Sequence, residues 1–206
     1  LQDATFVGDV GVRALEKDGT TALDLDTPRL EIAFAPAAAG DDPAPSQLRA
    51  TGSPRIPVVA RQPGTVFTAQ QLTVDLDPAS DPPSAAEGEP GAAQVTRLRA
   101  TGRVEVKLDE GDAHLTAHTL DADPRAQQMR LTGQGDQPAT LSRLGARLEG
   151  HDLTLNQADE SAHATGPGRF SAAVDPLDPR SEIEIDWTHA MTFNNRAGSA
   201  HFAGNV

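Results

Sequence analysis

The chain has 206 residues, with 18 glycines, 16 prolines and no cysteine, and its formal net charge is −13 at pH 7. The lack of cysteine excludes disulfide, zinc–thiolate and thiol chemistry, and the negative charge disfavours nucleic acid, which needs a basic patch. Hydrophobic residues make up 37% of the chain and aromatic residues 3%, so we expect a thin core between sheets, with no long helix and no transmembrane segment.

Alternating apolar and polar residues predict β-strands along most of the chain, because successive side chains of a strand point to opposite faces. In chain order, this pattern occurs in residues 6–14, 23–26, 30–35, 65–77, 102–109, 113–123, 129–131, 139–141, 148–156, 162–172, 182–187 and 191–194. No helical periodicity competes with it. The sequence therefore predicts an all-β, antiparallel fold.

The segments between these runs are rich in proline, glycine and small polar residues. Residues 36–47 and 78–94 have no periodicity, and we expect both to be flexible surface loops. Three prolines make residues 53–63 an edge strand or an irregular crossing, since proline cannot donate to a strand ladder. The glycine pairs at 133–135 and 166–168 are predicted to be turns.

Residues 98–123 form the clearest single unit. Val104 and Val106 alternate with charged residues, and residues 109–112 are of the types that favour a turn. A second alternating run, which contains Leu115 and Leu120, then follows as the returning strand. The predicted structure is a hairpin with one dry face and one wet face.

Two short patterns recur along the chain, and such internal similarity indicates a repeat architecture. Five residues, Leu48–Gly52, reappear letter for letter at Leu98–Gly102. A Gly-x-Val pattern, predicted to open strands, occurs at Gly8, Gly102 and Gly204. The longer pattern, an apolar residue followed by x-Ala/Gly-x-x-Leu and then by an acidic or amide residue, begins at Phe67, Leu115 and Leu148. Because the sequence ends as a Gly-x-Val pattern opens, we expect it to be a segment of a longer protein.

Taken in order, these patterns resemble the OstA-like family of lipopolysaccharide transport proteins. The resemblance is strongest over residues 98–172 and weakest between 36 and 97. It implies a single elongated, V-shaped β-jellyroll over residues 1–206, located in the periplasm and possessing an interior groove for acyl chains. It also implies lipopolysaccharide or a related glycolipid as ligand. Other modules of the same kind, including further copies, would join head to tail by addition of edge strands.

Under this hypothesis the apolar faces of the strands line a lipid-binding groove. The candidate lining residues are Phe6, Val10, Val12, Leu72, Val74, Val104, Val106, Leu115, Leu120, Leu153, Leu155, Ile183, Ile185, Trp187, Met191 and Phe193. The alternation alone leaves open an ordinary closed core, and with it a second hypothesis: a structural β-repeat module without a ligand.

Catalytic and metal sites receive little support from the sequence. His114 and His118 lie four residues apart but without the surrounding motif of a metalloprotease, so solvent-facing histidines are expected. The acidic pairs, such as Asp121 and Asp123, alternate with apolar residues at strand ends, where acids normally face water. Neither a nucleophile elbow nor a phosphate-binding loop occurs. We therefore expect no enzyme activity, metal or cofactor; a polysaccharide-active β-helical enzyme is a third, less favoured hypothesis.

Overall fold

The computed structural model describes residues 3–15, 21–36, 43–77, 94–109, 112–173 and 181–205. Apart from turns and short connections, these residues form β-strands and no helix, and every strand pairing is antiparallel, which confirms the predicted fold class. The strands are β1 (Asp3–Leu15), β2 (Thr21–Phe34), β3 (Pro45–Thr51), β4 (Val58–Gln62), β5 (Thr65–Ala69), β6 (Gln71–Asp77), β7 (Gln94–Leu108), β8 (Ala113–Asp123), β9 (Gln128–Thr132), β10 (Ala139–Arg143), β11 (Ala146–Asn156), β12 (Ser161–Ala173), β13 (Glu182–Trp187), β14 (Ala190–Asn194) and β15 (Ser199–Ala203).

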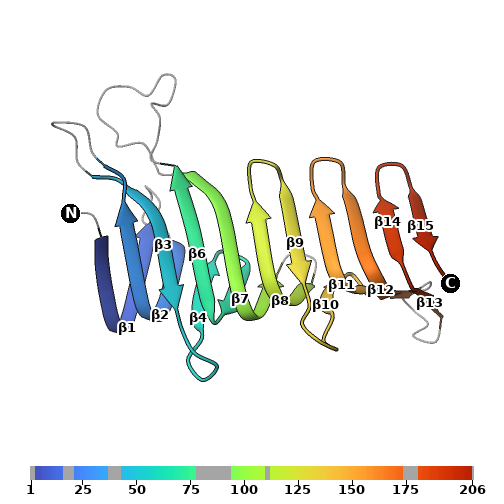
Figure 1. Ribbon diagram of the computed structural model, residues 1–206, viewed down its shortest axis with the longest axis horizontal. Helices are drawn as coiled ribbons and strands as arrows, with labels where there is room; N and C mark the ends of the chain where they lie inside the picture. Colours follow the sequence, from blue (N-terminus) through green and yellow to red (C-terminus); the bar gives the residue numbers. More distant parts are fainter. Residues whose placement is uncertain are drawn as a thin grey trace, which may run out of the picture.

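The strands form two arms that share six long strands. Of these, β2, β7, β8, β11 and β12 each have, along one edge, one partner in arm A and a different partner in arm B, whereas β1 pairs only with β2 among the described strands. Arm A runs β1, β2, β3, β6, β7, β8, β9, β11, β12, β14, β15, and in Figure 1 it is the row of strands between the two chain ends. Arm B runs β1, β2, β4, β5, β7, β8, β10, β11, β12, β13.

The long strands pass from one arm to the other at a line that we call the corner. In β7 the register shifts between Thr101 and Val104, and both Gly102 and Arg103 have positive φ, 76° and 50°. Only glycine adopts such a conformation without cost, which explains a glycine at this point. The prediction that the Gly-x-Val pattern opens strands is therefore wrong. The pattern marks bends, since Gly8 and Gly102 both lie inside long strands.

Two further expectations about proline and glycine segments are corrected at the corner. Residues 166–168 are not a turn but part of β12, where the strand bends between the arms. Residues 53–57 form the expected crossing, but residues 58–62 are an interior strand, β4, paired on both sides. Pro57 and Pro63 flank this strand, so neither interrupts its ladder.

Short segments cross between the arms at the corner, and their backbone groups form hydrogen bonds with the adjacent segment or strand. The Gly52 N–H donates to the Gln70 carbonyl at 2.7 Å, and the Gln70 N–H donates to the Gly102 carbonyl at 2.9 Å. The Gly166 N–H donates in the same way to His189 O at 2.7 Å. Since buried backbone groups need partners, these bonds allow the chain to cross the corner without leaving these groups unpaired.

The other loop expectations fall largely outside the described residues. Of the loop expected at 36–47, residues 37–42 are not described, and residues 45–47 already belong to β3. Of the loop expected at 78–94, residues 78–93 are not described, and Gln94 opens β7. The hairpin of residues 98–123 is confirmed by the β7–β8 pairing, from Leu98 with Ala122 to Leu108 with Ala113.

Candidate functional site: an apolar groove between the arms

The faces of the two arms that point toward each other are almost entirely apolar. Pairing register fixes which residues share this inner face: Val104 pairs with Ala117, and Leu120 pairs with Leu131. Among the inward positions of the described strands, the one charged residue is Arg143, which follows Ala139 and Leu141 in alternation on β10. The two arms therefore enclose an apolar space, with Arg143 and the neighbouring Arg147 at its margin.

This space is closed at the corner and open at the opposite side, which we call the mouth. Leu131 and Leu153, next to the corner, are each 0% exposed. Met129 and Leu155, which lie two positions further from the corner on the same strands, are only partly buried. Because exposure increases in this way along the inner face, the space is a groove with a packed floor and not a core closed on both sides.

One apolar cavity lies in the groove near its C-terminal end. Its volume is about 340 Å³, within the range of small-molecule sites. Residues from both arms line it: Leu141, Arg143, Ala146, Arg147, Leu148, Ala162, Phe170, Ile185, Met191, Phe193, Ala200 and Phe202. Trp187 closes the corner behind this region, with its ring centroid 5.7 Å from that of Phe202 and its indole N–H donating to Gly166 O at 3.0 Å.

A second apolar cavity lies near the N-terminal end of the groove. Its volume is about 310 Å³, and it is lined by Leu23, Leu25, Leu48, Ala50, Ala60, Gln62, Thr65, Phe67, Leu72, Val74, Leu76, Val95 and Leu98. Strands of both arms contribute, as in the first cavity. The groove therefore has a cavity toward each end, separated by the strands β8 and β9.

The candidate residues taken from the sequence divide into three groups in the structure. Leu72, Val74, Ile185, Met191 and Phe193 line one of the two cavities. The buried floor contains Val104, Leu115, Leu120, Leu153 and Trp187, whereas Val10, Val12, Val106 and Leu155 pack against it while partly exposed. Phe6 and Ile183 lie on strands at the two ends of the stack and are 47% and 49% exposed.

Several cavity residues were not among the sequence candidates. Phe67 and Leu148 open copies of the repeated pattern, and Leu141 alternates with polar neighbours, so the same signals could have identified them. Arg143 had no such signal. It alternates with Ala139 and Leu141 at the end of a short strand, but a charged residue gives no apolar signal, and its pairing with Ala146 on β11 shows that it faces inward.

The outer faces of both arms carry rows of ion pairs. Arg97 Nη2 lies 2.5 Å from Asp121 Oδ2, and Arg130 pairs with Asp152 two strands further on. The hydrogen bond from Arg97 holds the pKa of the Asp121 carboxyl below its ordinary value, and Arg99 adds to this. Such exposed pairs each contribute little stability, so they mainly keep the outer face polar.

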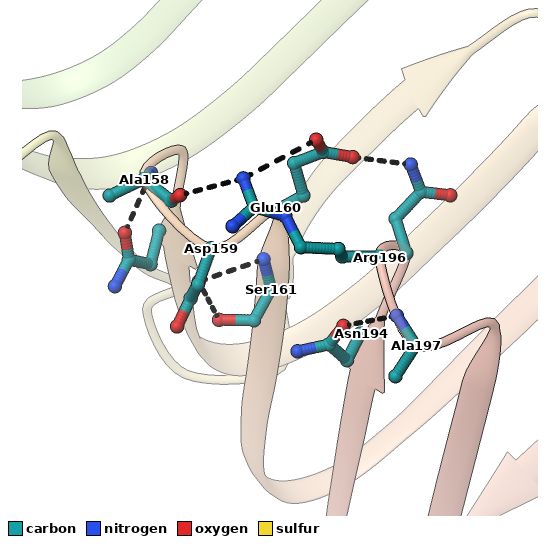
Figure 2. Close-up of polar contacts among 9 residues, drawn as sticks. Ala158, Asp159, Glu160, Ser161, Asn194, Arg196 and Ala197 are labelled. Atoms are coloured by element: carbon teal, nitrogen blue, oxygen red, sulfur yellow. Dashed lines mark hydrogen bonds and ion pairs between the residues drawn. The ribbon is translucent and has the colours of Figure 1, made fainter.

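At the mouth of arm A, successive hairpin turns stack on one another. The Gln157 N–H donates to Gln127 O at 2.9 Å, and the Asn195 N–H donates to Glu160 O at 3.0 Å. Figure 2 shows the second contact region, where Asn195 Nδ2 also donates to Glu160 Oε2 at 2.6 Å and Arg196 lies 3.9 Å from the same carboxylate. The rim of arm A is therefore a row of interlocked polar turns.

The acidic residues of this polar surface are the ones to examine for a metal site, which the sequence predicts to be absent. Four residues of the acidic pairs form ion pairs with arginines: Asp24, Asp26, Asp77 and Asp121. The other two accept hydrogen bonds instead, Asp75 from Gln47 Nε2 and Asp123 from the Ala126 N–H. In the part of the chain that the structure describes, no group of three or more histidine or acidic residues is placed to hold a metal ion. Within the same residues, no helix has the length and apolar character to cross a membrane.

Proteins similar to this chain were found among solved structures. Neither a family model nor a curated protein sequence matches the chain. Among solved structures, the chain is similar to LptH from Pseudomonas aeruginosa, described as the LptA homologous periplasmic component of the lipopolysaccharide transport device, with 13% identity and a TM-score of 0.44. The match covers 79% of this chain and 93% of that one.

Proposed function

We propose that this chain is a non-catalytic module that holds the acyl chains of a lipopolysaccharide-type glycolipid in the groove between its arms. The observation that supports this proposal is the inner face itself. It is apolar along both arms, partly exposed at the mouth, and hollowed into two cavities. The choice of lipopolysaccharide among amphiphiles comes from the sequence resemblance to the OstA-like family, which also suggests a periplasmic location.

The energetics of acyl-chain burial suit such a groove. Each methylene removed from water gains about 0.8 kcal/mol, so a few buried methylenes per chain give substantial affinity without a charged partner. The headgroup would lie outside the mouth, because the chain carries a net charge of −13 and a phosphorylated sugar is itself anionic. A groove open along one side accommodates both parts of such a ligand.

Photo-crosslinking from Val106 tests the proposal. Val106 lies on the inner face, paired with Phe67 and Leu115, whereas its neighbour Lys107 lies on the outer face beside Glu105. A photoreactive phenylalanine analogue at 106 is expected to yield an adduct with purified lipopolysaccharide, and the same analogue at 107 is expected to yield little. Equal adducts from both positions, or none from either, would contradict the proposal.

We also propose that copies or related modules join end to end at their edge strands. In the described residues, β1 forms one end of both arms, and β15 and β13 form the other, each with one edge unpaired by this chain. Unpaired strand edges pair readily with other strands.

Light scattering at rising concentration is expected to show self-association that weakens when Val7 is replaced by lysine. Val7 is exposed on β1, and lysine on an edge strand discourages pairing. The replacement Ile56→Lys provides a control, because Ile56 is also exposed but lies in a crossing segment between β3 and β4. A strict monomer at high concentration would rule out this mode of association.

A further inference from the structure

Arg143 occupies an unusual place for an arginine in this protein. It is on the inner face at the mouth of arm B, immediately before the tight turn at Leu144 and Gly145, and it lines the C-terminal cavity. The other members of that lining are apolar apart from Arg147, which alternates with the buried Leu148 and pairs with Glu149 at 2.5 Å. Arg143 thus places a positive charge beside an apolar hollow.

Most arginines in the described residues have a carboxylate partner, as Arg13, Arg29, Arg61, Arg97, Arg125, Arg130, Arg147, Arg169 and Arg196 do. Arg143 forms no ion pair or hydrogen bond with any described side chain. Its guanidinium, with five donors in a planar fork, is therefore free to bind an anion.

The N-terminal cavity provides an internal comparison. There the corresponding position is Gln62, the last residue of β4, which also faces inward and also precedes a tight turn, at Pro63 and Gly64. Both cavities offer an apolar floor of similar volume, but only the C-terminal one has a charge at its rim. The two cavities thus differ in the charge that they offer to a ligand headgroup, and not in size.

We infer that the C-terminal cavity is selective for an amphiphile whose anionic group, a phosphate or carboxylate, lies directly beside its acyl chain, with Arg143 binding that anion. Charge complementarity favours this occupant, because Arg143 has no carboxylate partner among the described residues, whereas the chain as a whole carries a net charge of −13 that disfavours an anion elsewhere. The N-terminal cavity, with Gln62 at its rim, makes no such distinction. This inference rests on the proposed function, since it assigns a headgroup preference to one part of the same groove.

Binding of single-chain amphiphiles tests the assignment. Monododecyl phosphate and dodecyl maltoside have the same chain and differ in headgroup charge, and both are used below their micellar concentrations. Trp187, the one tryptophan of the chain, contacts Phe202 of the cavity and reports binding there by its fluorescence. The phosphate is expected to bind about fivefold more tightly than the maltoside, as a charge-assisted contact at an exposed rim would give.

Three variants distinguish the roles of charge and cavity. Arg143→Gln is expected to remove the preference for the phosphate, and Arg169→Gln, which removes an equal charge from the outer face, is expected to leave it intact. The reciprocal Gln62→Arg is expected to create a second anion-selective site, measured by calorimetry.

Each contrary outcome has a separate meaning. A preference for the phosphate that survives Arg143→Gln would overturn the inference while leaving the proposed function standing. Displacement of the bound monododecyl phosphate by inorganic phosphate at equal concentration would also overturn it, because the anion would then bind without its chain. Failure of both amphiphiles to bind would contradict the proposed function itself.

Discussion

Replacing Gly168 by alanine is expected to lower the free energy of unfolding by about 3 kcal/mol, because the added methyl group has no room. Gly168 lies on β12 against Trp187, and a Cβ at this position would come within 2.5 Å of Glu149 O and 2.7 Å of Trp187 Cε2. Its φ is not positive, so the expected cost comes from these contacts and not from backbone strain. Urea unfolding followed by circular dichroism measures the change.

The matched control is Gly11→Ala on β1. A Cβ at residue 11 would meet only Asp26 Oδ1, at 3.8 Å, and the φ of Gly11 is likewise not positive. Alanine there is expected to be neutral or to stabilise by a few tenths of a kcal/mol, since glycine is costly inside a strand. Equal stability of the two variants would show that Trp187 does not pack against residue 168 as described.

Replacing Ala200 by tryptophan is expected to weaken lipopolysaccharide binding at least tenfold while the fold is preserved. Ala200 is exposed on β15, an edge strand, yet its side chain lines the C-terminal cavity. An indole there would occupy the space proposed for an acyl chain, and exclusion of two methylenes already corresponds to about 1.6 kcal/mol, or more than tenfold. Equilibrium binding of fluorescently labelled lipopolysaccharide measures the change.

Ala203→Trp on the same strand provides the control. Residues 200 and 202 face inward and line the cavity, so residue 203 faces outward, where tryptophan would change size and hydrophobicity without filling the groove. Binding by this variant is expected to match that of the unmodified protein. If Ala200→Trp bound lipopolysaccharide as well as Ala203→Trp does, the C-terminal cavity would not hold an acyl chain.

The strands were predictable because their alternation is regular and each has one face against the core. Val104, Leu115 and Leu153 were correctly placed inside by this pattern alone. The division into two arms was not predictable from alternation, because a strand alternates in the same way in either arm. The evidence for it in the sequence was Gly102 and its counterparts, which mark the bends but were interpreted as strand starts.

Some contacts of the groove residues could not be predicted, because they depend on information that a single sequence does not contain. Arg143 and Arg147 are four positions apart on either side of a tight turn and both line the C-terminal cavity, yet only Arg147 pairs with a carboxylate, that of Glu149. Likewise, the close approach of Trp187 to Gly168 depends on a pairing between β12 and β13. Register and turn geometry, which follow from tertiary pairing, decide both cases.

The stacked turns at the mouth of arm A have a consequence for how such proteins can change in length over evolution. Glu160 O accepts a hydrogen bond from the Asn195 N–H in the same way as Gln127 O accepts one from the Gln157 N–H. These successive turns therefore meet through the same backbone groups. Duplication or deletion of a pair of hairpins would then preserve every remaining contact, as in other quasi-one-dimensional repeat proteins. Groove length could thus change without redesign of the interior.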